Sequence, residues 1–265
     1  MISSLVFCEP LQEGTFSKHN GYYLMSALSK TMSDLAGLNL FHRQGDLRGQ
    51  KDFCLSPLLP AAFWRGHACR DCHGELSVKK GECWGFRLSF LKDGDFDLFR
   101  RTCVGKSFRI GETSFEIISV CLPGDNDMSC RTCVDELRGY AAAKGAEIRF
   151  LTPTGFHQDE DLQQIFPSPE LFFKSAAKRW ESLTDERIII AGGVQVQSFN
   201  LKSDVVNLKG GSYIRGCVGR VKYFWGRLSE EKRRQLTCLA LFSFYCGIGY
   251  KTTQGMGQVR PVGFL

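Results

Sequence analysis

The sequence has no run of about 18 consecutive apolar residues, the length that a membrane-spanning helix needs. Its first 14 residues, "MISSLVFCEPLQEG", include no Lys or Arg and only a short apolar stretch before Glu9. A signal peptide needs a basic start followed by a longer apolar segment. We therefore expect a cytoplasmic protein with no membrane partner.

A strong excess of one charge is also lacking, because 34 Lys and Arg against 28 Asp and Glu give a net charge of only +6. Such an excess permits a polyanionic partner without requiring one. The phosphate-binding pattern G-x-x-x-x-G-K-[ST] is absent, so the sequence does not support nucleotide hydrolysis. Histidine is scarce: the five are His19, His42, His67, His73 and His157.

The first half of the chain shows apolar patterns in the order β-α-β-β-α-β. Predicted strands lie at 3–10, 51–58, 82–91 and 106–122, the last being two paired strands that turn near Gly111. Helices are predicted at 22–38 and 95–104. The first helix is expected to bury one face, which contains Leu24, Met25, Leu28, Met32 and Leu35.

A polar stretch at 123–136 precedes a second half with the same order of elements. Strands are predicted at 146–154, within 187–201, at 212–225 and at 257–262. Ser168 and Pro169 begin one predicted helix, and Ser229 begins another that extends to Cys246. The pattern thus predicts an α+β chain of two tandem ferredoxin-like (RRM-like) domains, 1–140 and 141–265, each an antiparallel sheet with helices on one face.

Four of the 12 cysteines form two pairs with the C-x-x-C spacing of metal knuckles, Cys69 with Cys72 and Cys130 with Cys133. Four thiolates are the ligand set of a tetrahedral structural zinc. Fifty-seven residues separate Cys72 from Cys130, so tertiary folding would have to assemble such a site. A structural zinc is expected from this spacing, and the alternative is two unrelated pairs in variable loops.

A glycine-rich segment, "GIGYKTTQGMGQVR" at 247–260, follows the last predicted helix. Glycines permit positive φ angles and close approach of a ligand, while Lys251, Thr252 and Thr253 offer a cation and two hydroxyl groups. This combination suits phosphate oxygens. The alternative is a connection whose glycines serve only turn geometry.

The run "FSFYCGIGYKTTQGMGQVR", preceded by "GCVGRVKYFW", resembles the C-terminal signature of the CRISPR-associated repeat-processing endoribonucleases of the RAMP superfamily. "FLTPTGF", "FPSPELFFKSAAKRW" and "KDFCLSPL" resemble other segments of that family in the same order. The resemblance implies tandem ferredoxin-like domains that bind CRISPR repeat RNA. It also implies other CRISPR effector subunits as partners and no DNA ligand.

The resemblance implies that the loop positions RNA. The RNA-binding candidates in the loop are Gly247, Gly249, Lys251, Thr252, Thr253, Gly255 and Gly257. Arg215, Arg220 and Lys222, on the preceding predicted strand, are candidates for phosphate contacts.

Endonucleolytic cleavage of RNA needs no metal cofactor when the 2′-hydroxyl attacks the adjacent phosphate, but it needs proton transfer and cationic stabilisation. The resemblance places the catalytic histidine after the first helix, at His42, with Arg48 or Lys51 as the basic residue. His157 and His19 are the other candidates, and a tyrosine found in some members has no clear counterpart. The expected product carries a 2′,3′-cyclic phosphate.

Two other hypotheses remain from the sequence. A non-cleaving RAMP subunit that carries guide RNA would keep the loop and the basic strand but would not need the histidine. A zinc-stabilised scaffold for protein partners would depend on the cysteine knuckles instead.

Overall fold

The computed structural model describes residues 1–36, 51–66, 74–159, 162–190, 192–207 and 213–265. Within them the chain forms two compact units. The first comprises Met1–Arg131 with Thr253–Gly255, and the second comprises Thr132–Thr252 with Met256–Leu265. The domain limits that the sequence suggests, 1–140 and 141–265, stay a prediction.

The sheet of the first unit follows the order β3-β6-β1-β8-β7, and all its pairings are antiparallel. The central strand β1 (Ile2–Pro10) pairs with β6 (Trp84–Phe90) on one side and with β8 (Thr113–Val120) on the other. The shorter strands at this sheet are β3 (Phe53–Leu55), β4 (Leu59–Pro60), β7 (Ser107–Ile110) and β9 (Cys130–Arg131). A separate antiparallel pair joins β2 (Gly14–Ser17) to β5 (Glu75–Val78).

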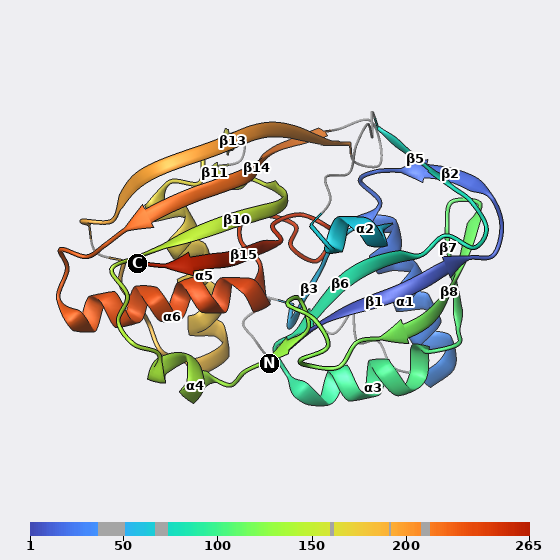
Figure 1. Cartoon of the computed structure of the whole chain (residues 1–265), viewed down its shortest axis with the longest axis horizontal. Helices are drawn as coiled ribbons and strands as arrows, with labels where there is room; N and C mark the ends of the chain where they lie inside the picture. The colour runs from blue at the N-terminus through green and yellow to red at the C-terminus, as the bar shows by residue number, and fades with distance from the viewer. Residues whose placement is uncertain (37–50, 67–73, 160–161, 191, 208–212) are drawn as a thin grey trace. The chain divides into compact units, whose positions relative to one another are not determined.

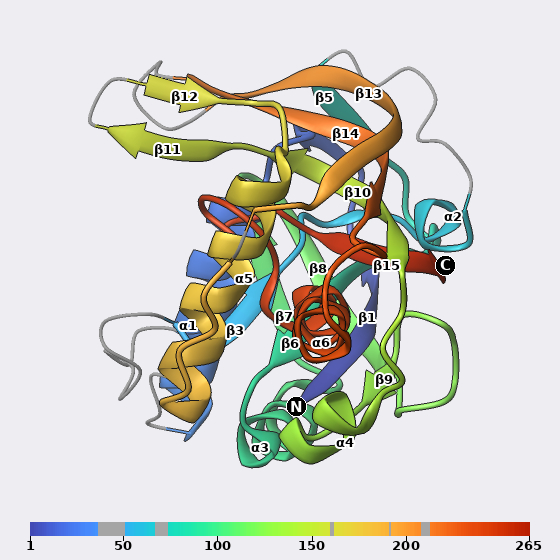
Figure 2. The ribbon, with the colours of Figure 1, turned by 90° about the vertical axis from the view of Figure 1, so that its left-hand side faces the viewer.

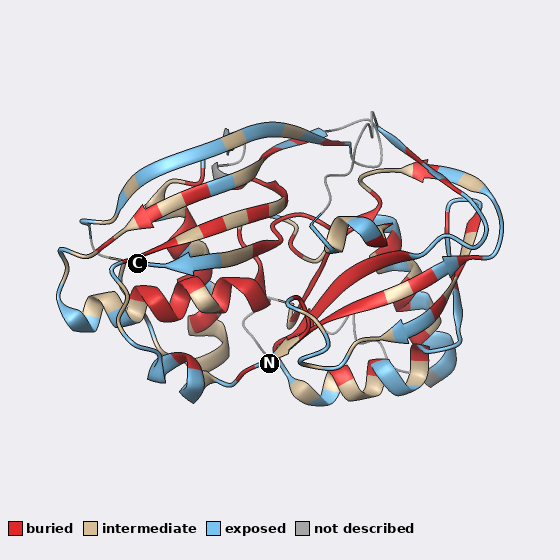
Figure 3. Ribbon diagram, viewed as in Figure 1, coloured by how far each residue is buried: buried red, intermediate tan, exposed pale blue. Residues whose placement is uncertain are grey.

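Helices α1 (Gly21–Ala36) and α3 (Asp93–Cys103) complete this unit, with the single turn α2 (Ala61–Trp64). Leu24, Leu28 and Met32 recur every four residues along α1 and are fully buried, which fixes the face of the helix that packs on the core. Leu35 was expected on this face but is 45% exposed. Figure 3 shows the buried colour along β1 and β6.

The sheet of the second unit has the order β13-β14-β10-β15, the ferredoxin-like arrangement. Its strands are β13 (Gln195–Asn207), β14 (Tyr213–Phe224), β10 (Gly145–Thr154) and β15 (Val259–Phe264). A small pair, β11 (Phe156–Asp159) with β12 (Leu162–Gln164), extends beyond β10. Figures 1 and 2 show α5 (Pro169–Thr184) and α6 (Glu230–Cys246) on one face of this sheet.

Capping residues explain where these two helices begin. The Ser168 Oγ accepts a hydrogen bond from Leu171 N at 3.3 Å, and the Ser229 Oγ accepts one from Lys232 N at 3.4 Å. Phe172 of α5 packs against Phe150 and Tyr223, so aromatic contacts fix the helix on the sheet. The short helix α4 (Val134–Gly139) also belongs to this unit.

The predicted fold class is confirmed, since both units have antiparallel sheets with the expected order of helices and strands. The strand expected within 187–201 begins only at Gln195. None of the helices in the described ranges is long and apolar enough to cross a membrane.

Candidate nucleic-acid interface

The glycine-rich loop starts where α6 ends, and positive φ angles determine its path. Gly247, Gly249, Gly255 and Gly257 have φ between 69° and 97°. Lys251 also lies in the left-handed region, with φ of 53°, which non-glycine residues seldom adopt. The glycines at these positions are therefore a requirement of backbone geometry.

Two of these glycines also sit where no side chain fits. A Cβ on Gly249 would lie 2.3 Å from the carbonyl oxygen of Gly155, and a Cβ on Gly257 would lie 2.1 Å from that of Ile248. Both neighbours are backbone atoms that cannot rotate away. The loop is therefore packed closely against the strand end at 153–155.

Hydrogen bonds from the loop's own amides maintain this packing. Tyr250 N donates to Gly155 O at 2.9 Å, and Gly257 N donates to Pro153 O at 3.0 Å. The Gly249 amide donates to the Ser175 hydroxyl at 2.9 Å, which ties the loop to α5. Because the amides of Gly249, Tyr250 and Gly257 are engaged within the protein, they shape the loop, and a ligand would contact the side chains between the glycines.

Among those side chains, Lys251 is the cationic group. It is half-buried, its Nζ lies 5.2 Å from the centre of the Tyr250 ring, and desolvation by burial lowers the pKa of its amine. Thr252 is buried, whereas Thr253 is half-buried. Thr253–Gly255 belong to the first unit, where Gly255 N donates to Leu55 O at 3.0 Å.

The three basic residues predicted on the preceding strand all lie on β14, but not on one side of it. Arg220 and Lys222 alternate with the buried residue Val221, so their side chains lie on the face of the sheet away from α5 and α6. Arg215 falls on the other side in this alternation and stacks over the Tyr213 ring at 5.4 Å. The structure thus brings together two of the three.

Two arginines that the sequence interpretation missed lie in register with Arg220. Arg149 of β10 pairs directly with Arg220 of β14, and on its other side with Arg260 of β15. We call Arg149, Arg220 and Arg260 the arginine row. Each strand shows an alternation that predicts a face, but the register between strands so distant in sequence carries no local signal.

Most of the proposed catalytic residues lie outside the described residues. His42 and Arg48 both fall in the range 37–50, which the structure does not describe. Lys51 is half-buried and lies two residues before β3. Of the alternatives, His19 is half-buried just before α1, and the backbone of His157 lies in β11, paired with Gln163.

The proposed zinc ligands are only partly described, because Cys69 and Cys72 also lie outside the described residues. The Cys133 Sγ accepts a hydrogen bond from Glu136 N at 3.5 Å and caps α4, while the Cys130 Sγ donates to Asp127 O at 3.7 Å. In the part of the chain that the structure describes, no three His, Cys, Asp or Glu side chains form a group that could hold a metal. The zinc site therefore stays a prediction from spacing.

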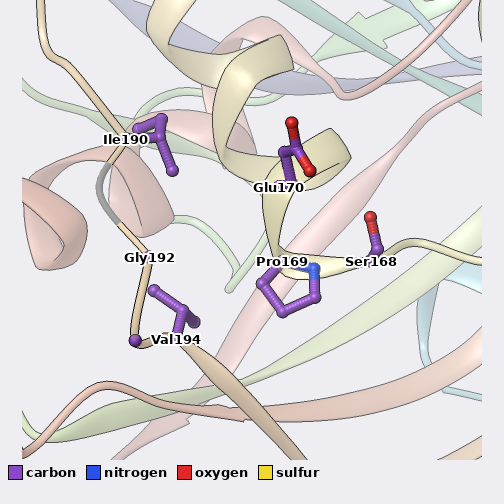
Figure 4. Close-up of a pocket in the computed structure, with 7 residues that line it drawn as sticks. Ser168, Pro169, Glu170, Ile190, Gly192 and Val194 are labelled. Atoms are coloured by element: carbon purple, nitrogen blue, oxygen red, sulfur yellow. The ribbon is translucent and has the colours of Figure 1, made fainter.

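A cavity of about 410 Å³ lies beside the start of α5 (Figure 4). Glu170 stands there across from Ile190 and Val194, and its carboxylate pairs with Lys174 at 2.6 Å. An acidic and partly apolar lining does not suit a polyanion. We therefore place the candidate interface at the glycine-rich loop and the open face of the sheet.

Residues 148–259 match the family described as CRISPR-associated endoribonuclease Cas6, and both the glycine-rich loop and most of the sheet fall within that span. Residues 148–259 are thus similar to the Cas6 family, over somewhat less than half of the chain. This confirms the resemblance to the repeat-processing endoribonucleases. No curated protein matches the sequence significantly.

Solved Cas6 structures share the fold over the whole chain. A Cas6 in complex with its product is 22% identical, with a TM-score of 0.78, and the alignment covers 99% of this chain and 100% of the other. A Thermus thermophilus Cas6 is 21% identical, with a TM-score of 0.70 and 98% of both chains covered. A Cas6-related protein from Pyrococcus furiosus is 13% identical, with a TM-score of 0.64 and again 98% of both chains covered.

Proposed function

We propose that this chain binds CRISPR repeat RNA and cleaves precursor CRISPR RNA, as a metal-independent endoribonuclease, into mature guide RNAs. The observation that carries the proposal is the Cas6 family match, which includes the glycine-rich loop with Lys251 between its glycines. Similar structures include a Cas6 product complex, in which the relative holds its product. The fold over 99% of this chain is the same.

The proposed chemistry uses the nucleophile that RNA itself provides. His42 would accept the proton of the 2′-hydroxyl as it attacks the adjacent phosphate, because an unperturbed imidazole has a pKa of about 6.5. Arg48 or Lys51 would stabilise the charge that develops on the phosphorane. The bond to the 5′-oxygen then breaks as this oxygen takes up a proton, from protonated His42 or from water, which leaves a 2′,3′-cyclic phosphate and a 5′-hydroxyl. DNA lacks the 2′-hydroxyl and would not be cleaved.

The first experiment incubates the protein in excess EDTA with labelled repeat RNA from the host's own CRISPR array. Substrates are the natural RNA and an RNA with a single 2′-deoxy substitution at the mapped cut site. We expect the wild type to cut only the natural RNA, and His42→Ala to lose at least about 100-fold in rate. His157→Ala serves as the matched histidine control and should retain the wild-type rate.

Each of the other outcomes identifies which part of the proposal is wrong. If His157→Ala loses the activity and His42→Ala keeps it, the nuclease stands and the assignment of the base is wrong. Tight binding without cleavage by any variant would favour the guide-carrying subunit, and one solved structure of this fold, 16% identical, is of a RAMP protein that binds different RNA substrates. Absence of RNA binding would leave the protein-interaction scaffold.

A further inference from the structure

The arginine row runs straight across three neighbouring strands of the second unit. The backbone register pairs Arg149 with Arg220 on one side and with Arg260 on the other. The same register continues to the edge strand, where Asn200 of β13 pairs with Arg220. Since neighbouring strands lie about 4.8 Å apart, the three arginines span about 10 Å.

The row lies on the side of the sheet that the helices leave open. The sequence neighbours of Arg149, Ile148 and Phe150, are buried beneath the helices, so by alternation Arg149 lies on the opposite face. The side chain of Arg220 is 57% exposed, and Arg149 and Arg260 are half-buried. The guanidinium groups are therefore within reach of a large ligand.

Three like charges in one row are an electrostatic cost to the folded protein, because like charges directly opposite on neighbouring strands repel each other. The pKa of the Arg149 guanidinium is lowered, first by burial and then by the charges of Arg220 and Arg260. Glu147 offsets part of this repulsion through an ion pair with Arg220 at 3.2 Å. A polyanion laid on the row would offset more of it.

The glycine-rich loop contacts the paired strands β13 and β14, and Arg220 of the row lies on β14. Met256 of the loop forms a small buried cluster with Val206 and Ile214, which are paired across β13 and β14. Ile214 and Arg220 are six residues apart on β14, an even spacing that places them on the same side of the strand. Six residues of strand span about 20 Å along β14, whereas Arg260 follows the loop residue Gly257 by three residues, about 10 Å at most, so the row extends from the end of the loop across the sheet.

We propose that the arginine row is a second phosphate-binding site, which holds the backbone of the RNA on the open face of the sheet, beside the glycine-rich loop. The inference rests on the proposed function, since it takes repeat RNA as the ligand. Guanidinium groups suit this role because each can donate two parallel hydrogen bonds to a phosphate. Lys222, two residues along β14 from Arg220, adds a further positive charge on that face. The carboxylate of Glu147, which pairs with Arg220, opposes the binding of RNA because it repels phosphate.

The test measures the dissociation constant for repeat RNA, with the cut site blocked by 2′-deoxy substitution, over a series of salt concentrations. The variants are Arg149→Gln, Arg220→Gln and Arg260→Gln, singly and together, with Arg260→Lys as the conservative change. Arg234→Gln is the matched control, because Arg234 is an exposed arginine on α6 that pairs with Glu230. Melting curves of each variant establish that it is folded.

We expect each Gln variant to weaken binding about 2- to 10-fold at fixed salt, and Arg260→Lys to weaken it less than Arg260→Gln, because lysine keeps the charge but not the paired hydrogen bonds. The slope of log affinity against log salt concentration is negative, and its magnitude should decrease by about 0.7 per arginine for single-stranded RNA, or by about 0.9 for a duplex. Glu147→Gln should bind more tightly than the wild type. Arg234→Gln should match the wild type in both quantities.

A folded triple variant with unchanged affinity and unchanged salt slope would overturn the arginine row as a binding site. Cleavage of natural repeat RNA by the wild type in that same case would leave the proposed function standing. If the wild type neither binds nor cleaves repeat RNA, both proposals are wrong.

Discussion

Gly249 shows how strongly a single residue can constrain the glycine-rich loop. Its φ of 82° is unfavourable for any residue with a Cβ, and the new atom would lie 2.3 Å from Gly155 O. We expect Gly249→Ala to lower the free energy of unfolding by about 1–3 kcal/mol. Urea denaturation followed by fluorescence measures this loss.

Gly263→Ala is the matched control for that experiment. Gly263 lies in β15, and a Cβ there would meet nothing within 4 Å. This substitution should change the free energy of unfolding by less than about 0.5 kcal/mol. Equal stability of the two variants would show that the loop adjusts its backbone, and our account of its rigidity would be wrong.

At the scale of secondary-structure elements, an ion pair connects the short helix α4 to the end of α5. Arg138 of α4 donates from Nη2 to Glu186 Oε2 at 2.8 Å, and Trp180 of α5 donates to the same oxygen at 3.3 Å. The hydrogen bond from Arg138 is the main cause that lowers the pKa of Glu186 below its ordinary value of 4.5. The pair therefore stabilises the fold only while Glu186 is ionised.

Because the folded-state pKa is the lower one, the stabilisation is present above about pH 4.5 and is lost as the pH falls through the folded value. Glu186→Gln should be less stable than the wild type at pH 7, by under about 1 kcal/mol since the pair is partly exposed. The difference should shrink steadily on acidification. Denaturant titrations at a series of pH values measure it.

Arg138→Gln should show a similar pH dependence, and the double variant should lose less than the sum of the two single losses, because both substitutions remove the Arg138–Glu186 contact while Arg138→Gln also removes the pair with Asp135. A stability difference that stays constant from pH 7 to pH 3 would show that Glu186 contributes through packing and not through its charge.

The sequence predicted the helices better than it predicted the strands. Ser168 with Pro169, and Ser229 before two glutamates, are local signals, and both helices begin there. The turn near Gly111 was likewise predictable, and Gly111 has a φ of 60° between β7 and β8. Local chemistry determines such features, so one sequence is enough to find them.

Features that depend on distant partners could not be predicted in the same way. The run Ile188–Ile190 is apolar enough for a strand, yet β13 begins only at Gln195, where pairing with β14 starts. The arginine row needs the register of strands whose paired residues are more than 60 positions apart in the sequence. The predicted roles of His42 and Arg48 rest on the family resemblance, and both residues lie outside the ranges that the structure describes.

At the scale of the whole molecule, the predicted zinc site affects how the proposed nuclease is tested. If Cys69, Cys72, Cys130 and Cys133 hold one structural zinc, excess EDTA could unfold the protein and abolish cleavage without any metal in the chemistry. We predict about one zinc per chain in protein purified without chelator. Metal analysis by mass spectrometry measures it.

Cys130→Ser with Cys133→Ser should then lose the zinc and lower the melting temperature, whereas Cys83→Ser, which changes an exposed cysteine outside both knuckles, should alter neither. A wild-type protein free of zinc, with the same melting temperature in EDTA, would show that the two pairs are ordinary thiols. The EDTA cleavage experiment is then free of this complication.

The first unit is not one continuous piece of chain, because it includes Thr253–Gly255. Translation releases residues 1–131 early, and domains generally fold as they emerge. Here the bond from Gly255 N to Leu55 O must wait until synthesis has nearly ended. A nascent chain that stalls before residue 253 therefore exposes an incomplete N-terminal unit, and chaperones and proteases would meet it in that form.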